Sequence, residues 1–189
     1  MAPKPTESPS LPRIGVPATG VILGSMLSGG MGSLSAFVIP VFLDTDVAAD
    51  HMLRQWVRLY HYGHIYMPAV CVATCGIFAY AFLDKRSSSS SSSSSRHHQS
   101  DPSRSAASRY GLAAVSTIAM VPFTWLVMAP TNNTLFRLES LGSAVTDLAL
   151  VRTLLVRWAW LHAVRSLSPL LGAFVGFTGL VQELGAGGE

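Results

Sequence analysis

Three polar residues stand at helical spacing near the start of the last apolar segment of the chain. Trp158, His162 and Arg165 fall at i, i+4 and i+7, so that a helix would carry them on one face. An imidazole exchanges a proton near neutral pH and is a natural general base. A guanidinium is a fixed cation that suits an oxygen becoming negative during a reaction. We therefore expect His162 and Arg165 to carry chemistry.

Further polar residues lie at the matching ends of two other apolar segments. The second segment begins, the third ends and the fourth begins on the same side of a membrane, so these residues should converge on one site. The expected catalytic residues are His162, Arg165, His64 and Asn132. The expected substrate contacts are Trp56, Tyr60, His61, Asn133 and Trp158. The residues leave open whether His162 or His64 is the base.

Arg165 stands about two helical turns inside its segment. A charge at that depth normally faces a cavity in a bundle and has a partner there. The alternative is an arginine that snorkels to the headgroups. Its companions His162 and Trp158, on the same face, favour the cavity.

Two prolines follow candidate residues at the same spacing. Pro68 comes four residues after His64, and Pro169 four after Arg165. A proline inside a helix cannot bond the carbonyl four residues back, and free carbonyls at membrane depth belong beside protein or a wet cavity. The pair indicates either a pocket or two plain kinks.

The elements that must position these residues are membrane spans. Of the 189 residues, 49% are apolar and only 12% charged, about half the charge of a soluble domain. Four segments are long and apolar enough to cross a bilayer: residues 18–43, 62–83, 110–128 and 158–181. We predict an all-α fold, a bundle of four transmembrane helices in one domain of residues 18–183. A flexible arm (1–17) precedes it and a tail (184–189) follows.

The connections differ between the two sides of the membrane. Residues 84–108 form a low-complexity, Ser-rich loop. The opposite connections have helical periodicity, which predicts short interfacial helices leading into the second and fourth spans. Lys and Arg favour the side of the N-terminal arm and the Ser-rich loop, so both termini should be cytoplasmic. We expect the endoplasmic reticulum or another endomembrane.

Small residues recur every fourth position in the first span. The series comprises Gly20, Gly24, Ser28, Gly32 and Ala36, and Gly172 and Gly176 repeat the spacing in the fourth span. Small residues allow helices to approach closely in lipid, so we interpret both sets as packing seams.

Several other classes of site are disfavoured. We interpret Cys71 and Cys75 as small core residues rather than a redox or metal pair. A metal site at His97 and His98 is disfavoured because they lie in the flexible Ser-rich loop. The sequon Asn132-Asn133-Thr134 lies too close to the membrane for easy glycosylation. The chain has no basic stripe for nucleic acid, and no nucleotide-binding or hydrolase motif. We predict no cofactor from these residues, and a metal is not excluded.

The sequence resembles one family over nearly its whole length, apart from the Ser-rich loop. The resemblance rests on Met128-Ala-Pro-Thr-Asn-Asn-Thr-Leu135, on the segment Val151–Leu167 with its Trp-x-x-x-His-x-x-Arg face, on Gln55–Gly63 and on the Gly-rich first span. These features are similar to those of the fungal anthrone oxygenases. The resemblance implies a membrane enzyme of aromatic polyketide biosynthesis, which oxidises an anthrone to the anthraquinone with O₂ as co-substrate.

Under that resemblance each candidate residue has a role. His162 or His64 would remove a methylene proton, Arg165 and Asn132 would stabilise the enolate oxygen, and Trp56, Tyr60 and Trp158 would stack on the tricycle. The substrate would be emodin-anthrone-like or noranthrone-like. Two alternatives stay open: a metal-dependent membrane oxidase that uses His51, His61, His64 and His162, and a non-catalytic four-span protein. The sequence leaves the oligomeric state undetermined.

Overall fold

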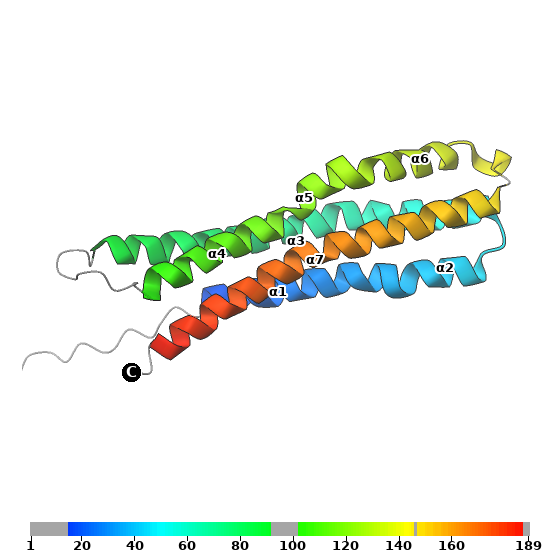
Figure 1. Ribbon diagram of the computed structural model, residues 1–189. Helices are drawn as coiled ribbons and strands as arrows, with labels where there is room; N and C mark the ends of the chain where they lie inside the picture. Colours follow the sequence, from blue (N-terminus) through cyan, green and yellow to red (C-terminus); the bar gives the residue numbers. More distant parts are fainter. Residues whose placement is uncertain (1–14, 92–101, 146, 187–189) are drawn as a thin grey trace, which may run out of the picture.

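The computed structural model describes residues 15–91, 102–145 and 147–186. Within these ranges every regular element is helical, and four long segments run antiparallel beside one another (Figure 1). The first segment comprises α1 (Gly15–Ser33), η1 (Leu34–Val38) and α2 (Ile39–Thr45), and the second is α3 (Ala49–Ser91). The third comprises α4 (Pro102–Ile118), α5 (Met120–Phe123), η2 (Thr124–Met128) and α6 (Ala129–Glu139). The short η3 (Gly142–Ala144) leads to α7 (Leu148–Ala186).

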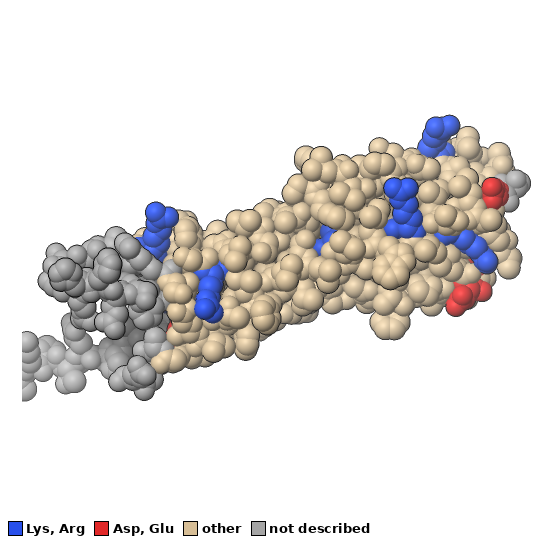
Figure 2. Space-filling model, in the orientation of Figure 1, with Lys and Arg blue, Asp and Glu red and all other residues tan. Residues whose placement is uncertain are grey.

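All four segments have the length and composition of membrane spans. The helical stretches Gly15–Thr45, Ala49–Ser87, Ser105–Glu139 and Leu148–Gly185 each contain a window apolar enough to cross a bilayer. On the face shown in Figure 2, charged side chains lie mainly toward the two ends, with a broad and nearly uncharged band between them. The prediction of an all-α bundle with four transmembrane helices is confirmed.

The helices extend further than the predicted spans. The interfacial stretches are continuous with the spans, since α3 already begins at Ala49 and α7 at Leu148. Adding residues to a formed helix costs little compared with nucleating a new one. For the same reason the predicted loop 84–108 is shortened, because α3 continues to Ser91 and α4 starts at Pro102. The histidine pair of this loop, His97 and His98, lies outside the described residues, as do positions 1–14 of the arm.

Polar contacts fix the ends of the helices. Asp147 caps α7, since its carboxylate accepts a hydrogen bond from the Leu150 amide at 2.9 Å. Arg152 of α7 donates to the carbonyl of Leu43 near the end of α2 and to that of Asp46 in the turn that follows. At the opposite end, Lys85 of α3 pairs with Glu183 of α7 at 2.9 Å. These contacts set the axial register of α7 against its neighbours.

The small residues form the predicted seams over most of their length. A Cβ at Gly20 would meet the Phe78 ring at 2.9 Å, and one at Gly24 would meet Ala173 at 3.2 Å. Ser28 is buried and donates to the carbonyl of Ser166 at 2.9 Å. The seam then ends, because Ala36 is exposed. Ala36 lies within η1, where a wider helical turn moves the following residues to a different face.

Replacing Gly172 with alanine should destabilise the bundle. The added Cβ would collide with the hydroxyl of Thr117 and lie 2.9 Å from the backbone oxygen of Ala113 in α4. Overpacking of this kind costs about 1–3 kcal/mol, so the unfolding temperature in detergent should fall. Gly76→Ala is the control, since apart from its chain neighbours and the nearby backbone of its own helix no described heavy atom lies within 4 Å of the new Cβ. Equal unfolding temperatures for the two variants would refute the seam.

The third segment is bent where α4 gives way to α5 and η2 (Figure 1). Ala119 separates α4 from α5 while keeping helical hydrogen bonds to Val115 and Phe123, and Pro122 follows inside α5. A proline deprives the carbonyl four residues earlier of its partner, and a π-turn is a second source of bending. As a result α6 stands away from the axis of α4 (Figure 1).

Candidate functional site

A cavity of about 350 Å³ lies at the level of the bend, with an opening to the surface of the bundle. Three long helical segments and η1 contribute to its wall. Its polar and aromatic lining consists of Tyr60, His64, Thr124, Trp125, Asn132, Trp158, His162 and Arg165. Its apolar and backbone lining consists of Leu34, Leu59, Gly63, Met67, Pro68, Met120, Val121 and Met128. The expected convergence of three span ends thus produces one concave site, of a size suited to a small molecule.

The cavity is lined by the face of α7 that carries Trp158, His162 and Arg165, as their spacing predicts. His162 is 2% exposed, and its ring stacks on Trp158 with centroids 4.5 Å apart. Its Nδ1 lies 3.4 Å from the hydroxyl of Ser35 in η1. The stacking on Trp158 and the contact with Ser35 together hold the imidazole in a defined orientation.

Arg165 lies about 12 Å along α7 from Arg157, the preceding charged residue of that helix. Its Nη1 donates to the hydroxyl of Thr124 at 2.9 Å. None of the ion pairs found among the described residues includes it, and its buried Nε has no hydrogen-bond partner within those residues. The guanidinium faces the cavity, so the snorkelling alternative does not describe its position.

The wall formed by α3 is aromatic and includes the second histidine. The rings of Tyr60 and His64 stack with centroids 5.6 Å apart and an interplanar angle of 10°. His64 is exposed at the rim, and its Nδ1 lies 3.2 Å from the carbonyl of Tyr60 in the preceding turn. Its Nε2 is therefore the nitrogen free to meet a ligand. Pro68 also lines the cavity, which agrees with the pocket interpretation of that proline.

The side chain of Asn132 projects from α6 into the same space. Asn132 is 5% exposed and lines the cavity, which explains why the formal sequon is sterically unsuited to glycosylation. Its Oδ1, like the indole nitrogen of Trp158, is buried and has no hydrogen-bond partner among the described residues. Buried polar atoms in proteins are nearly always bonded. These atoms, together with Nε of Arg165, form a set of polar groups that a ligand can satisfy.

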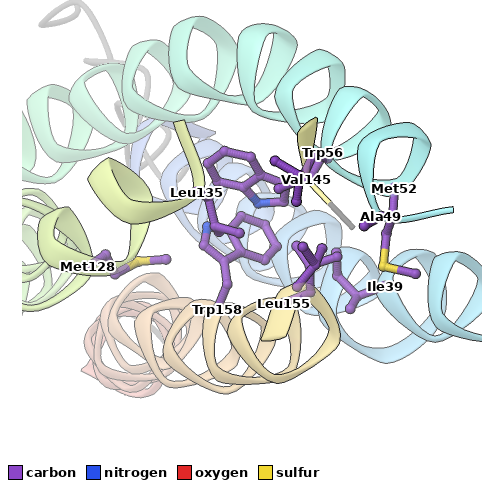
Figure 3. Close-up of a cluster of buried hydrophobic side chains, with 11 residues drawn as sticks. Ile39, Ala49, Met52, Trp56, Met128, Leu135, Val145, Leu155 and Trp158 are labelled. Carbon is purple, nitrogen blue, oxygen red and sulfur yellow. The ribbon is translucent and has the colours of Figure 1, made fainter. Parts of the chain in front are cut away.

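The remaining predicted contacts lie outside the cavity lining. Trp56 is fully buried in the core between α3 and α7, where it meets Trp158 edge to face at 6.1 Å (Figure 3). It supports Trp158 from behind, because the lining does not include it. His61 and Asn133 are exposed on α3 and α6 and do not line the cavity. Sequence spacing places residues along a helix, but a one-residue error moves a side chain about 100° around it.

The histidines are spread over several surroundings. His51 pairs with Asp46 at 2.6 Å in the turn before α3. The rings of His61 and His64 have centroids 5.5 Å apart, while His162 contacts Ser35 and Trp158. Within the described residues, no three His, Cys, Asp or Glu side chains lie together as a metal site. The four histidines of the metal-oxidase alternative are therefore not gathered into one cluster.

The π-helical turns contribute a part of the site that the sequence did not predict. Thr124, Trp125 and Met128 of η2 and Leu34 of η1 line the cavity. A signal for them exists in the sequence, since Pro40 and Pro130 follow these segments at identical spacing. Free cysteines take no part in the lining: Cys71 is buried and donates to the carbonyl of Thr117.

Comparison with known proteins yields one family. The profile of the anthrone oxygenases matches residues 56–175. A relative described as an anthrone oxygenase of Aspergillus novofumigatus is 57% identical over 89% of this chain and 95% of its own length. An anthrone oxygenase of a Cryptosporiopsis species is 44% identical over 97% of this chain and 99% of its own. A third, from Aspergillus fumigatus, is 46% identical over 88% and 93%. No solved structure matches.

Proposed function

Because this chain belongs to the anthrone oxygenase family, we propose that its cavity binds an anthrone and oxidises it to the anthraquinone. An emodin-anthrone-like or noranthrone-like polyketide is the proposed substrate class. The observation that carries the proposal is the state of Arg165. A guanidinium faces the cavity in the membrane-spanning region, without a carboxylate partner among the described residues. A ligand that becomes an anion can supply the missing partner of the guanidinium, as the oxygen of a deprotonated anthrone would.

The chemistry follows from the acidity of the substrate. The central methylene of an anthrone loses a proton to form an enolate, whose charge rests largely on the carbonyl oxygen across the ring. His162 or His64 accepts that proton. Arg165 donates to the enolate oxygen, and the side-chain amide of Asn132 does so as a neutral donor. Tyr60 and Trp158 hold the flat tricycle by stacking.

Oxygen then enters at the deprotonated carbon. The carbanion transfers electrons to O₂ and forms a C–O bond, and a proton returned from the base gives the hydroperoxide. Loss of the second methylene proton and cleavage of the O–O bond yield the quinone carbonyl and one water. One oxygen atom of O₂ is retained and the other is released, with no electrons required from elsewhere. We propose that the reaction needs neither a metal nor an organic cofactor.

The proposed setting is an endomembrane with both termini in the cytosol. The start of α1, the end of α7 and the facing ends of α3 and α4 lie at one end of the bundle (Figure 1), as four antiparallel spans require. The cavity is then nearer the non-cytoplasmic surface. Its apolar surroundings suit a substrate that partitions into lipid.

Membranes containing the protein should convert an anthrone to the quinone in air but not under argon. Quinone absorbance measures the reaction, and membranes without the protein correct for spontaneous oxidation of anthrones. Isotopically labelled O₂ should appear in the new carbonyl. A rate in air no higher than that of control membranes would refute the proposed function.

Chelators should leave the activity unchanged, as the cofactor proposal requires. The purified protein is dialysed against a strong chelator, its metal content is measured, and turnover is compared before and after. Loss of activity that returns only with one added metal would refute cofactor independence and favour the metal-oxidase alternative. The anthrone assay itself would still identify the reaction.

A further inference from the structure

Two π-helical turns interrupt the helices, and both end at the same distance from a proline. In η1 the amide of Ile39 bonds the carbonyl of Leu34, and in η2 the amide of Ala129 bonds that of Thr124. Each of these bonds spans five residues and each precedes a proline, Pro40 or Pro130, by one residue. A proline crowds the carbonyl four residues back and offers it no N–H. A widened turn accommodates both the crowding and the missing N–H. Each proline therefore indicates where a π-helical turn lies.

Both turns meet the cavity at a predicted catalytic residue. Ser35, in η1, lies 3.4 Å from Nδ1 of His162. Thr124, the first residue of η2, accepts a hydrogen bond of 2.9 Å from Arg165. Single π-helical turns are rare in proteins, but those that occur are often found at functional sites. Of these two contacts, the one between Arg165 and Thr124 is the better hydrogen bond, because its distance of 2.9 Å is shorter than the 3.4 Å between Ser35 and His162.

The hydroxyl of Thr124 has a fixed direction. It donates its single proton to the carbonyl of Met120 at 2.7 Å. Its lone pairs are then free to accept from Arg165, which can only donate. The two consecutive hydrogen bonds, from Arg165 to Thr124 and from Thr124 to Met120, therefore have only one possible direction. They fix the position of one nitrogen of the guanidinium.

The π-turn also sets which residues share the cavity wall. Thr124 and Asn132 are eight residues apart, which in a regular α-helix separates them by roughly 80°. Because η2 accommodates one extra residue in its turn, the effective spacing is about seven, or roughly 20°. Thr124 and Asn132 consequently line the same cavity.

From these contacts we propose that Thr124 is a positioning residue for Arg165, and that the π-turn ended by Pro130 holds it in place. Thr124 acts through Arg165, so the remaining guanidinium donors are directed at the substrate oxygen. The inference rests on the proposed function for its catalytic meaning, but the contact itself is independent of it.

Thr124→Val keeps the shape of the side chain and removes the hydroxyl. A displaced catalytic group costs up to about 100-fold, so we expect kcat to fall between about 10- and 100-fold, with KM changed less than about threefold. The isotope effect for a substrate deuterated at the methylene should rise, because proton removal becomes more fully rate-limiting. Thr124→Ser should restore most of the rate. Pro130→Ala should show the same kind of kcat loss, since the turn can then relax to a regular helix.

Thr153→Val is the matched control. Thr153 also donates to the carbonyl four residues back, at 2.9 Å, but it is exposed on α7 and outside the cavity lining. We expect wild-type kcat and isotope effect from this variant. A purely structural role of Thr124 would lower the active fraction without moving KM or the isotope effect.

A double-mutant cycle with Arg165→Met decides the inference. If Thr124 acts through Arg165, Thr124→Val has little further effect on kcat in the Arg165→Met background. Fully additive losses would overturn the proposal. If the wild-type protein does not oxidise an anthrone, the proposed function fails instead, and the same cycle is then read from unfolding temperatures. Coupling between the two sites in that measurement supports the contact, and additivity refutes it.

Discussion

Replacing Arg165 with methionine is expected to lower kcat for anthrone oxidation by about 100- to 1,000-fold, the usual cost of removing one oxyanion donor. Methionine keeps much of the length and apolar volume of the side chain. The fall in kcat is therefore caused by the loss of the charge and the hydrogen-bond donors, and not by an empty space. The enolate develops its charge in a site where no described carboxylate pairs with the guanidinium. Steady-state quinone formation in detergent or reconstituted membranes measures the effect.

Two further variants separate charge from geometry at this position. Arg165→Lys keeps the cation but offers a compact ammonium in place of a planar fork, so we expect an intermediate rate. Arg157→Met removes an exposed arginine two turns earlier on the same helix, outside the cavity lining, and should leave kcat unchanged. Wild-type turnover by Arg165→Met would contradict an oxyanion role.

Arg165→Met should not unfold the bundle. Within the described residues, the hydrogen bond to Thr124 is the only one that this side chain makes. Burying a cation away from water is costly, and methionine removes that cost. We therefore expect an unfolding temperature equal to or above that of the wild type, which makes the kinetic loss interpretable.

The architecture of the chain was predictable because the membrane restricts it strongly. Backbone groups in lipid must bond within their own segment, which leaves helices as the solution for long apolar stretches. Long uncharged runs and few charges therefore indicate four spans before any packing is known. The antiparallel order follows from connectivity alone, and it brings the ends of three spans together around His162 and Arg165.

Side-chain direction was predictable only where the helix is regular. Trp158, His162 and Arg165 lie on an uninterrupted part of α7, and spacing placed all three on the cavity wall. Trp56 illustrates the limit, since it is predicted to stack on the substrate, whereas packing against Trp158 takes it into the core. Tertiary neighbours decide which part of a helical face is open, and a single sequence does not contain them.

The π-turns mark the main gap in the sequence prediction. Thr124 falls within the predicted span 110–128 and helical spacing does not single it out, although it contacts Arg165 at 2.9 Å. A five-residue turn changes the phase of every later residue, so a fixed period of 3.6 fails beyond it. Ala36 shows the same failure, since the small-residue stripe predicts it in the seam and it is exposed.

Replacing His162 with phenylalanine is expected to lower kcat by about 100- to 10,000-fold, the range for a lost general base. Phenylalanine keeps a ring that can stack on Trp158 and removes both nitrogens. We expect a larger loss here than from His64→Phe, because His162 is 2% exposed and is oriented by Trp158 and Ser35. His64 is exposed at the rim and bonds its own helix.

The isotope effect at the methylene identifies the base more directly than the rate. Removing the base makes proton transfer slower than every later step, so the isotope effect for His162→Phe should reach its full value. Added imidazole should partly restore turnover in His162→Ala, where the side-chain volume is vacant, but not in His162→Phe. Trp160→Leu is the control, since that residue is 72% exposed on the same helix. A wild-type rate and isotope effect in His162→Phe, with both altered in His64→Phe, would transfer the role of base to His64.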